Sequence, residues 1–200
     1  MTTIEPRVGE QRPGGRAARV RASVLVATSQ VLIESGYEKL NIEAVAKRAG
    51  VHKTTVYRRW PTKAQLVFDA VRAQAEANIP IPDTGTLLGD LEALALDVIS
   101  NLETDGSRRQ ARTLVAAAST SEELAEGMNA FWARRFRESS VIVERAVERG
   151  ELPSDADANL IVQSVVGPIW LRLLLTGEPI DDKLATRLAT LVATGARGHA

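Results

Sequence analysis

The chain has no cysteine and only two histidines, His52 and His199. Without a thiol it can form neither a disulfide nor a thiolate metal site. The sequence also contains no glycine-rich phosphate loop and no nucleophile elbow. These absences argue against an enzyme, so we expect no catalytic site, no metal and no cofactor.

Aromatic residues and long apolar runs are also scarce. Phe, Trp and Tyr make up 4% of the 200 residues, although apolar residues of all kinds reach 44%, as in a globular protein with a core. The most apolar stretch, 160–176, is interrupted by Gln163, Pro168 and Arg172, so we expect no membrane span. The basic N-terminal segment lacks the apolar centre of a signal peptide, which fits a cytoplasmic location.

The formal net charge is zero, but the charges are unevenly distributed. Residues 1–60 carry eleven Lys and Arg against five acids, whereas the remainder carries fourteen against twenty. A basic head on an acidic body indicates that the head meets a polyanion, unless the clustering is due to chance.

The spacing of apolar residues predicts an all-α protein with about nine helices and no strand. Gly36 is expected to end the first helix, and Asn41 to cap the second. The prolines of residues 79–85 predict a linker between two helical regions. The helices are expected at 16–35, 42–49, 53–60, 63–78, 86–103, 107–118, 121–150, 154–177 and 181–195.

Residues 41–63, NIEAVAKRAGVHKTTVYRRWPTK, form the most informative segment. They predict two short helices joined by a turn at Gly50, and the second helix is basic and rich in hydroxyl groups on its outer side. Such a helix-turn-helix places a helix end in the major groove of DNA. Val56 and Trp60 are expected to be core residues of this unit.

The amino end of the second helix is expected to point toward the floor of the groove, with the positive end of the helix dipole. Residues there read base edges, whereas those around it pair with phosphates and only position the protein. His52 has the alternative of an ordinary surface histidine, and Arg58 and Arg59 that of a solvated pair. The expected base contacts are His52, Lys53, Thr54 and Tyr57. The expected phosphate contacts are Asn41, Arg48, Thr55, Arg58, Arg59 and Lys63.

Three short stretches of this segment, Ala49-Gly50-Val51, Thr55-Val56-Tyr57 and Pro61-Thr62-Lys63, follow a helix that ends in glycine. Together they resemble the TetR family of transcriptional regulators over residues 16–70. The resemblance implies a homodimer with three-helix DNA-binding heads and larger helical bodies that dimerise and hold a ligand cavity. Some members read a base with a basic residue at the position of Glu43, so this chain departs from them there.

The domains that follow from this resemblance are a flexible basic tail (1–15), a DNA-binding domain (16–62), a connecting helix (63–78) and a regulatory and dimerisation domain (79–200). Arg12, Arg16 and Arg19 are candidates to reach the DNA backbone or the minor groove.

The last two predicted helices are apolar on more than one side, so each must be covered on both sides. The resemblance implies that they form the dimer contact; the alternative is that both are buried within one subunit. The expected interface residues are Val165, Val166, Ile169, Leu173, Leu184, Leu188 and Leu191.

Large apolar side chains of the body can surround a flat hydrophobic ligand, although the same residues can equally form a core. Arg135, Arg172 and Gln163 are possible polar anchors. The expected lining residues are Leu94, Val98, Leu102, Leu114, Met128, Phe131, Trp132, Phe136 and Trp170.

These expectations describe a repressor that binds a palindromic operator as a homodimer and is released by a small, mostly apolar effector. The alternative is a dimeric regulator whose body only dimerises or binds a protein partner. The operator sequence, the regulated genes and the effector are not readable from the residues.

Overall fold

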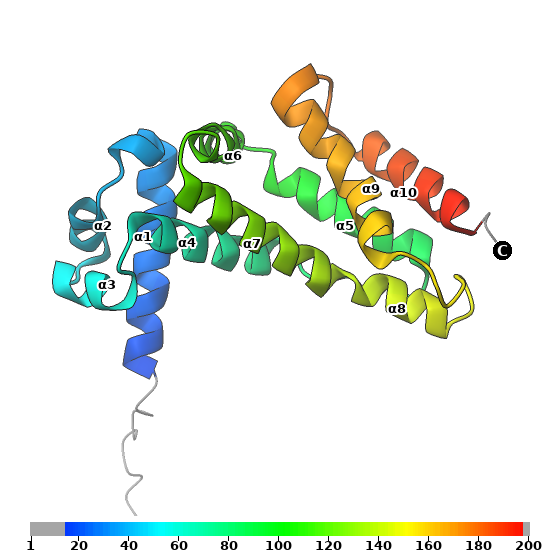
Figure 1. Ribbon diagram of the computed structural model, residues 1–200, viewed down its shortest axis with the longest axis horizontal. Coiled ribbons are helices and arrows are strands. Elements are labelled where there is room, and N and C mark those ends of the chain that lie inside the picture. Colours follow the sequence, from blue (N-terminus) through cyan, green and yellow to red (C-terminus); the bar gives the residue numbers. More distant parts are fainter. Residues whose placement is uncertain (1–14, 198–200) are drawn as a thin grey trace, which may run out of the picture.

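The computed structural model describes residues 15–197, and all regular secondary structure within this range is helical (Figure 1). This confirms the predicted fold class. The predicted tail, with Arg12, and His199 lie outside the described residues, apart from Gly15. The helices are α1 (Gly15–Lys39), α2 (Ile42–Ala49), α3 (Lys53–Arg59), α4 (Lys63–Asn78), α5 (Leu87–Asn101), α6 (Asp105–Ala118), α7 (Glu122–Ser139), α8 (Val141–Glu148), α9 (Ala158–Leu171), the π-helix η1 (Arg172–Thr176) and α10 (Asp182–Arg197).

Helices α1, α2 and α3 form a compact head at one end of the elongated molecule (Figure 1). Gly36, with φ of 75°, breaks the helical path of α1. The Asn41 side chain accepts a hydrogen bond from the Ala44 N–H at 2.7 Å and so caps α2. Gly50, with φ of 67°, makes the left-handed turn between α2 and α3. Val56 and Trp60 are buried, so α3 is held by the head core.

Helices α5 to α10 form the body, and its apolar core joins α5, α8, α9 and α10. A second apolar cluster unites the head with α4 and continues into α6 and α7 through Leu114, Ala117 and Leu124. Helices α4, α6 and α7 therefore connect the head to the body, and any movement of the head relative to the body involves their contacts.

Two predicted helices differ in the structure. The helix expected over 121–150 is divided at Ser140, whose hydroxyl donates to the Arg137 carbonyl at 2.8 Å; such local bonds compete with the helical pattern. The helix expected from 154 begins at Ala158, because Asp157 caps it by accepting from the Leu160 N–H at 3.0 Å. Its last turn is the π-helix η1.

Candidate nucleic-acid interface and ligand cavity

The amino end of α3 lies on the surface of the head. His52 stands at the N-cap position and makes no side-chain capping bond, and Lys53, Thr54 and Tyr57 are exposed with it. Tyr57 follows Lys53 by one helical turn and therefore shares its face. The structure thus brings the four predicted base-contacting residues together on one accessible surface. Their contact with DNA stays a prediction.

Glu43, in the first turn of α2, contacts two of these residues. Its Oε1 accepts a hydrogen bond from the Tyr57 hydroxyl at 3.3 Å and lies 3.9 Å from the Lys53 ammonium. Partial burial, together with the nearby charge of Glu43, raises the pKa of Tyr57 above its usual value. The Tyr57 hydroxyl therefore stays protonated near neutral pH and donates a hydrogen bond to Glu43. These contacts could not be predicted from the sequence, because they depend on how α2 and α3 cross.

The predicted phosphate contacts have different surroundings. Arg58 is exposed, and the guanidinium of Arg59 lies 5.6 Å from the centre of the Trp60 ring. Arg48 pairs with Glu34 at 2.7 Å, so the Glu34 carboxylate would compete with a phosphate for the Arg48 guanidinium. Thr55 is only partly exposed. The Oδ1 of Asn41 accepts the capping bond of α2, so a contact with a phosphate would come from its Nδ2 amino group, which is the donor of this side chain.

Lys63 is turned toward the end of α1. Its ammonium donates to the carbonyl of Tyr37 at 3.0 Å and to that of Glu38 at 3.5 Å, and it lies 4.0 Å from the centre of the Tyr37 ring. Cations stabilise the carbonyl end of a helix and the face of an aromatic ring. Lys63 therefore links α4 to α1 within the head, a role that its sequence position did not indicate.

Asp69 on α4 fixes the other end of α3. It accepts a hydrogen bond from the Trp60 indole N–H at 2.9 Å and one from Arg72 at 3.0 Å, and Arg21 of α1 lies 3.6 Å away. Sequence reasoning missed Asp69, because its partners come from three separate segments. The contact makes the position of α3 depend on that of α4.

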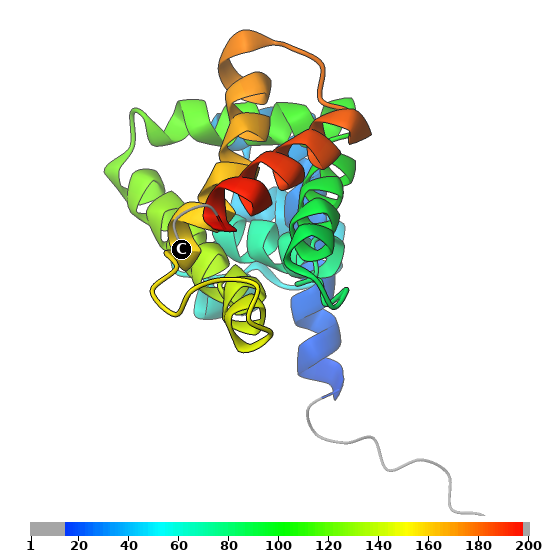
Figure 2. The same cartoon turned by 90° about the vertical axis from the view of Figure 1, so that its right-hand side faces the viewer.

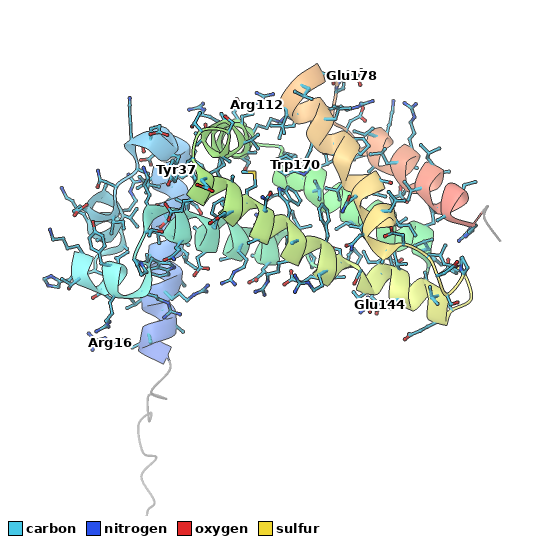
Figure 3. All side chains as sticks on the ribbon, viewed as in Figure 1. Arg16, Tyr37, Arg112, Glu144, Trp170 and Glu178 are labelled. Carbon is cyan, nitrogen blue, oxygen red and sulfur yellow. The ribbon has the colours of Figure 1, made fainter. Side chains whose placement is uncertain are left out.

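A cavity of about 120 Å³ lies between α4, α5, α6, α7 and α9. All nine predicted lining residues stand at its wall, and Figure 3 shows Trp170 among α6, α7 and α9. Whether a ligand binds there stays a prediction. Sequence reasoning missed part of the wall, including residues of the connecting helix α4. The additional lining residues include Phe68, Val71, Ala75, Ile79, Gln110, Val162 and Val166.

The wall of the cavity is aromatic on the side of α7 and α9. The Trp132 ring packs edge-on against Trp170, with ring centres 5.1 Å apart, and is stacked with Phe136 at 5.4 Å. Among the described residues that line the cavity none is acidic, and Arg135 is the charged one. Arg135 donates to the Ile79 carbonyl at 2.9 Å, so its charge is largely satisfied by the protein. The described part of this wall is thus mainly apolar and aromatic.

The other two predicted anchors lie away from the cavity wall. Gln163 is exposed on α9, and Arg172 pairs with Glu178 at 3.1 Å beyond the end of that helix. Neither residue lines the cavity, because the lining residues of α9, Val162, Val166 and Trp170, follow each other at intervals of four and Gln163 and Arg172 lie off that stripe.

Phe68 connects the cavity to the head. It lines the cavity from α4, and its ring lies against Gly127 of α7 so closely that a Cβ added at Gly127 would stand 2.4 Å from Cδ2 of Phe68. Only glycine allows this approach of a ring to the α7 backbone. A guest that displaced Phe68 would therefore act on α4.

The predicted dimer interface needs a correction. Six of its residues are buried within the chain itself, where they pack in the core of α5, α8, α9 and α10. The chain's own helices cover these side chains and leave little of their surface for a partner. The six residues are Val165, Val166, Ile169, Leu173, Leu184 and Leu188.

Leu191, the seventh, is exposed, and so are Leu160, Leu171 and Leu175, which sequence reasoning missed. We call these four residues, on α9, η1 and α10, the outer face. Figure 2 shows α10 on the side nearest the viewer, crossing in front of part of α9. Leu175 is 79% exposed and Leu191 71% exposed, so the outer face presents large apolar side chains to its surroundings.

Residues 158–176, which combine α9 and η1, are long and apolar enough to cross a membrane, the single such case within residues 15–197. Only 33% of the most apolar window is buried in the chain. Length and composition alone are weak evidence for a span, since core helices of other proteins share them. In the fold, one side of this segment packs in the body core and the other belongs to the outer face.

Two protein-family models match the chain. Residues 24–70 match the model described as bacterial regulatory proteins of the tetR family, and residues 81–192 match the tetracyclin repressor-like C-terminal domain. The first match spans the head and the start of α4, and the second covers most of the body.

Characterised relatives have similar length and architecture. The chain is 32% identical to the HTH-type transcriptional regulator AqdR of Rhodococcus erythropolis, over 96% of this chain and 92% of AqdR. It is 34% identical to the DNA-binding transcriptional repressor TetR of Mycobacteroides abscessus, over 88% of this chain and 95% of that protein. The crystal structure of the TetR family transcription regulator SCO0332 matches with a TM-score of 0.77 and 32% identity, over 88% of this chain and 98% of that one.

Proposed function

The chain belongs to the TetR family of transcriptional regulators, and we propose that it is a repressor that binds a palindromic operator as a homodimer and is released by a small apolar effector. Members of this family are DNA-binding helix-turn-helix regulators and not enzymes. We also propose a cytoplasmic location, because a bacterial regulator of this family acts on DNA there. The name of the relative from Mycobacteroides abscessus, a DNA-binding transcriptional repressor, supports repression.

The exposed amino end of α3 is the observation that carries the proposal. Lys53, Thr54 and Tyr57 stand on one surface, and Trp60 is anchored to Asp69 at the other end of the same helix. A short helix fixed at its carboxyl end and free at its amino end can enter the major groove without rearrangement. Selection of bound duplexes from a random pool tests this directly. We expect an inverted repeat, and enrichment of no sequence would contradict the proposal.

Dimerisation is supported by the outer face. Gly167, on the same side of α9, has open space around the position of a Cβ, so two α9 helices can approach closely there. Leu171→Asp is expected to convert a dimer of the 21.6 kDa chain into a monomer, as measured by light scattering. Val26→Asp changes an exposed apolar residue of α1 and is the matched control. A wild-type monomer, or equal loss in both variants, would contradict this interface.

The effector site is supported by the aromatic cavity and by the position of Phe68 between cavity and head. A thermal-shift screen of uncharged aromatic compounds should give ligands that raise the melting temperature, because a ligand that binds only the folded state stabilises it. The same compounds should release bound DNA. Ala111→Phe, which fills the cavity from α6, should abolish both effects while DNA binding remains.

The alternative is a body that only dimerises or binds a protein partner. It predicts that compounds binding the cavity leave DNA affinity unchanged, and that Ala111→Phe has no effect on regulation. The aromatic lining and the absence of acidic residues from the part of the wall that the structure describes favour the effector.

A further inference from the structure

An acidic side chain belongs to the surface that the head presents to DNA. The Glu43 side chain is 52% exposed and the Lys53 side chain 63% exposed, with their charged atoms 3.9 Å apart. Tyr57, which bonds to Glu43, is also exposed. The three residues join the first turn of α2 to the first two turns of α3. Glu43 is therefore close enough to touch whatever Lys53 and Tyr57 touch.

A carboxylate in this place is unfavourable toward the phosphate backbone, because it repels the charges that the surrounding cations attract. It can interact favourably only with hydrogen-bond donors. In the major groove the donors are the exocyclic amino groups of cytosine and adenine, and a carboxylate accepts most simply from N4 of cytosine.

The carboxylate has the capacity to do this while it keeps its partners in the protein. The contacts with Tyr57 and Lys53 both involve Oε1. A carboxylate has two oxygens with about four acceptor positions, so Oε2 can accept from a base. The first turn of α2 is also well fixed, since the Asn41 cap and the Gly50 turn define both ends of this short helix. The backbone that carries Glu43 is thus fixed before DNA binds.

We propose that Glu43 determines operator specificity by accepting a hydrogen bond from N4 of a cytosine in each half-site. Its Oε1 meanwhile holds Tyr57 and Lys53 in position. This inference rests on the proposed function, because it requires a specific operator. It adds a negatively charged base reader to a surface otherwise expected to bind DNA through cations and hydroxyl groups.

Selection from a random duplex pool, with sequencing of the bound fraction, tests the inference in the full-length protein. Wild type should require cytosine at one position of each half-site, with an advantage of roughly tenfold over other bases. Glu43→Ala should abolish the preference at that position alone. Glu43→Gln should move it from cytosine toward adenine, because an amide pairs with adenine.

The matched control is Glu34→Gln. Glu34 is an exposed acid of the same head and pairs with Arg48, another predicted DNA-contacting cation. Glu43→Gln and Glu34→Gln each remove one negative charge from an ion pair of the head, but Glu34 pairs with Arg48, whereas Glu43 contacts Lys53 and Tyr57. The control should change affinity for all sequences alike and keep the wild-type base profile.

Three results would overturn the inference. An unchanged profile in Glu43→Ala would show that the acid only modulates charge. Changes confined to the positions that Lys53→Ala also alters would show that it only positions Lys53. A wild-type profile without any preferred sequence would contradict the proposed function as well as the role of Glu43. The first two results would contradict only the role of Glu43, so the two failures can be told apart.

Discussion

Lys53 and Lys63 have the same side chain in different surroundings. Lys53 reaches out beside Glu43, whereas Lys63 donates to the Tyr37 carbonyl at 3.0 Å and covers the Tyr37 ring. An ammonium that bonds to carbonyls inside the head stabilises the folded protein even when no DNA is bound. We therefore expect substitution of the two lysines to have different consequences.

Lys53→Ala should change which bases are preferred, because an ammonium in the groove donates to guanine acceptors. Arg58→Ala, which removes an exposed cation of the same helix, should weaken binding to all sequences alike and reduce the salt slope by about 1. Lys63→Ala, unlike these two substitutions, should lower the melting temperature of the protein, because it removes the hydrogen bonds between α4 and the end of α1. Binding profiles on a duplex panel measure the first two effects. Identical base profiles for Lys53→Ala and wild type would contradict the role of Lys53.

Several features of single residues could be predicted from the sequence. The cap at Asn41, the turn at Gly50 and the exposure of the α3 amino end follow from local rules of hydrogen bonding and backbone freedom. The pairing of Glu43 with Tyr57 could not be predicted, because it joins residues of two helices through their crossing angle.

At the scale of elements, α4 packs against both the head and α7, so these two helices join the head to the body. The Phe68 ring lies against Gly127, and Asp69 holds Trp60, so one turn of α4 touches both the cavity wall and the end of α3. Packing here leaves no room for a methyl group added at Gly127, so the Phe68 ring lies directly against the α7 backbone.

Gly127→Ala should destabilise the protein by about 1 to 3 kcal/mol, because the new Cβ overlaps the Phe68 ring and forces it to move. Gly195→Ala is the matched control: it lies in α10 with open space around it, and alanine there should be neutral or stabilise by up to about 1 kcal/mol. Urea denaturation of both variants measures the free energy of unfolding. Equal effects at the two positions would argue against the close contact.

Glu151 joins three elements of the body. Its two oxygens accept from the Leu87 N–H at the start of α5, each at 3.0 Å, and pair with Arg149 at 2.8 Å and Arg197 of α10 at 2.9 Å. Burial raises the pKa of Glu151, but these partners stabilise its charged form by more, so its pKa is lowered overall from 4.5.

A lowered pKa means that ionised Glu151 stabilises the folded state above its ordinary pKa of 4.5, and that this contribution is lost as the pH falls through the lower folded value. The difference in free energy of unfolding between wild type and Glu151→Gln should therefore be largest near neutral pH and shrink below 4.5. Glu148→Gln, at an exposed acid of α8, serves as control. A difference that is independent of pH would show that the ion pairs contribute nothing.

The helix positions were largely predictable, since Thr62 and Ser121 accept the capping bonds that their sequence positions indicate. The orientation of the last two helices was not. Ile169 and Leu173 face the core while Leu171 and Leu175 face outward, although all four are equally apolar. A helix that is apolar all round does not reveal which side its own chain covers.

At the scale of the whole molecule, α3 and α10 stand at opposite ends of the chain (Figure 1). The cavity lies between them, with α4 in its wall. The sequence predicted the division into a basic head and a helical body, because charge and the helix-turn-helix are local features. The sequence also predicted nine apolar residues of the cavity wall, but the cavity volume and the α4 part of the wall depend on how five helices pack and could not be predicted.

The central claim is that the amino end of α3 enters a DNA duplex in both subunits of a dimer. The most direct test is fluorescence anisotropy of wild type on the selected inverted repeat and on a copy with one half-site scrambled. Affinity for the intact repeat should fall by on the order of a thousandfold or more between 50 and 200 mM salt, and the scrambled copy should bind far more weakly. Equal binding to both duplexes, or an affinity that does not change with salt, would contradict the account.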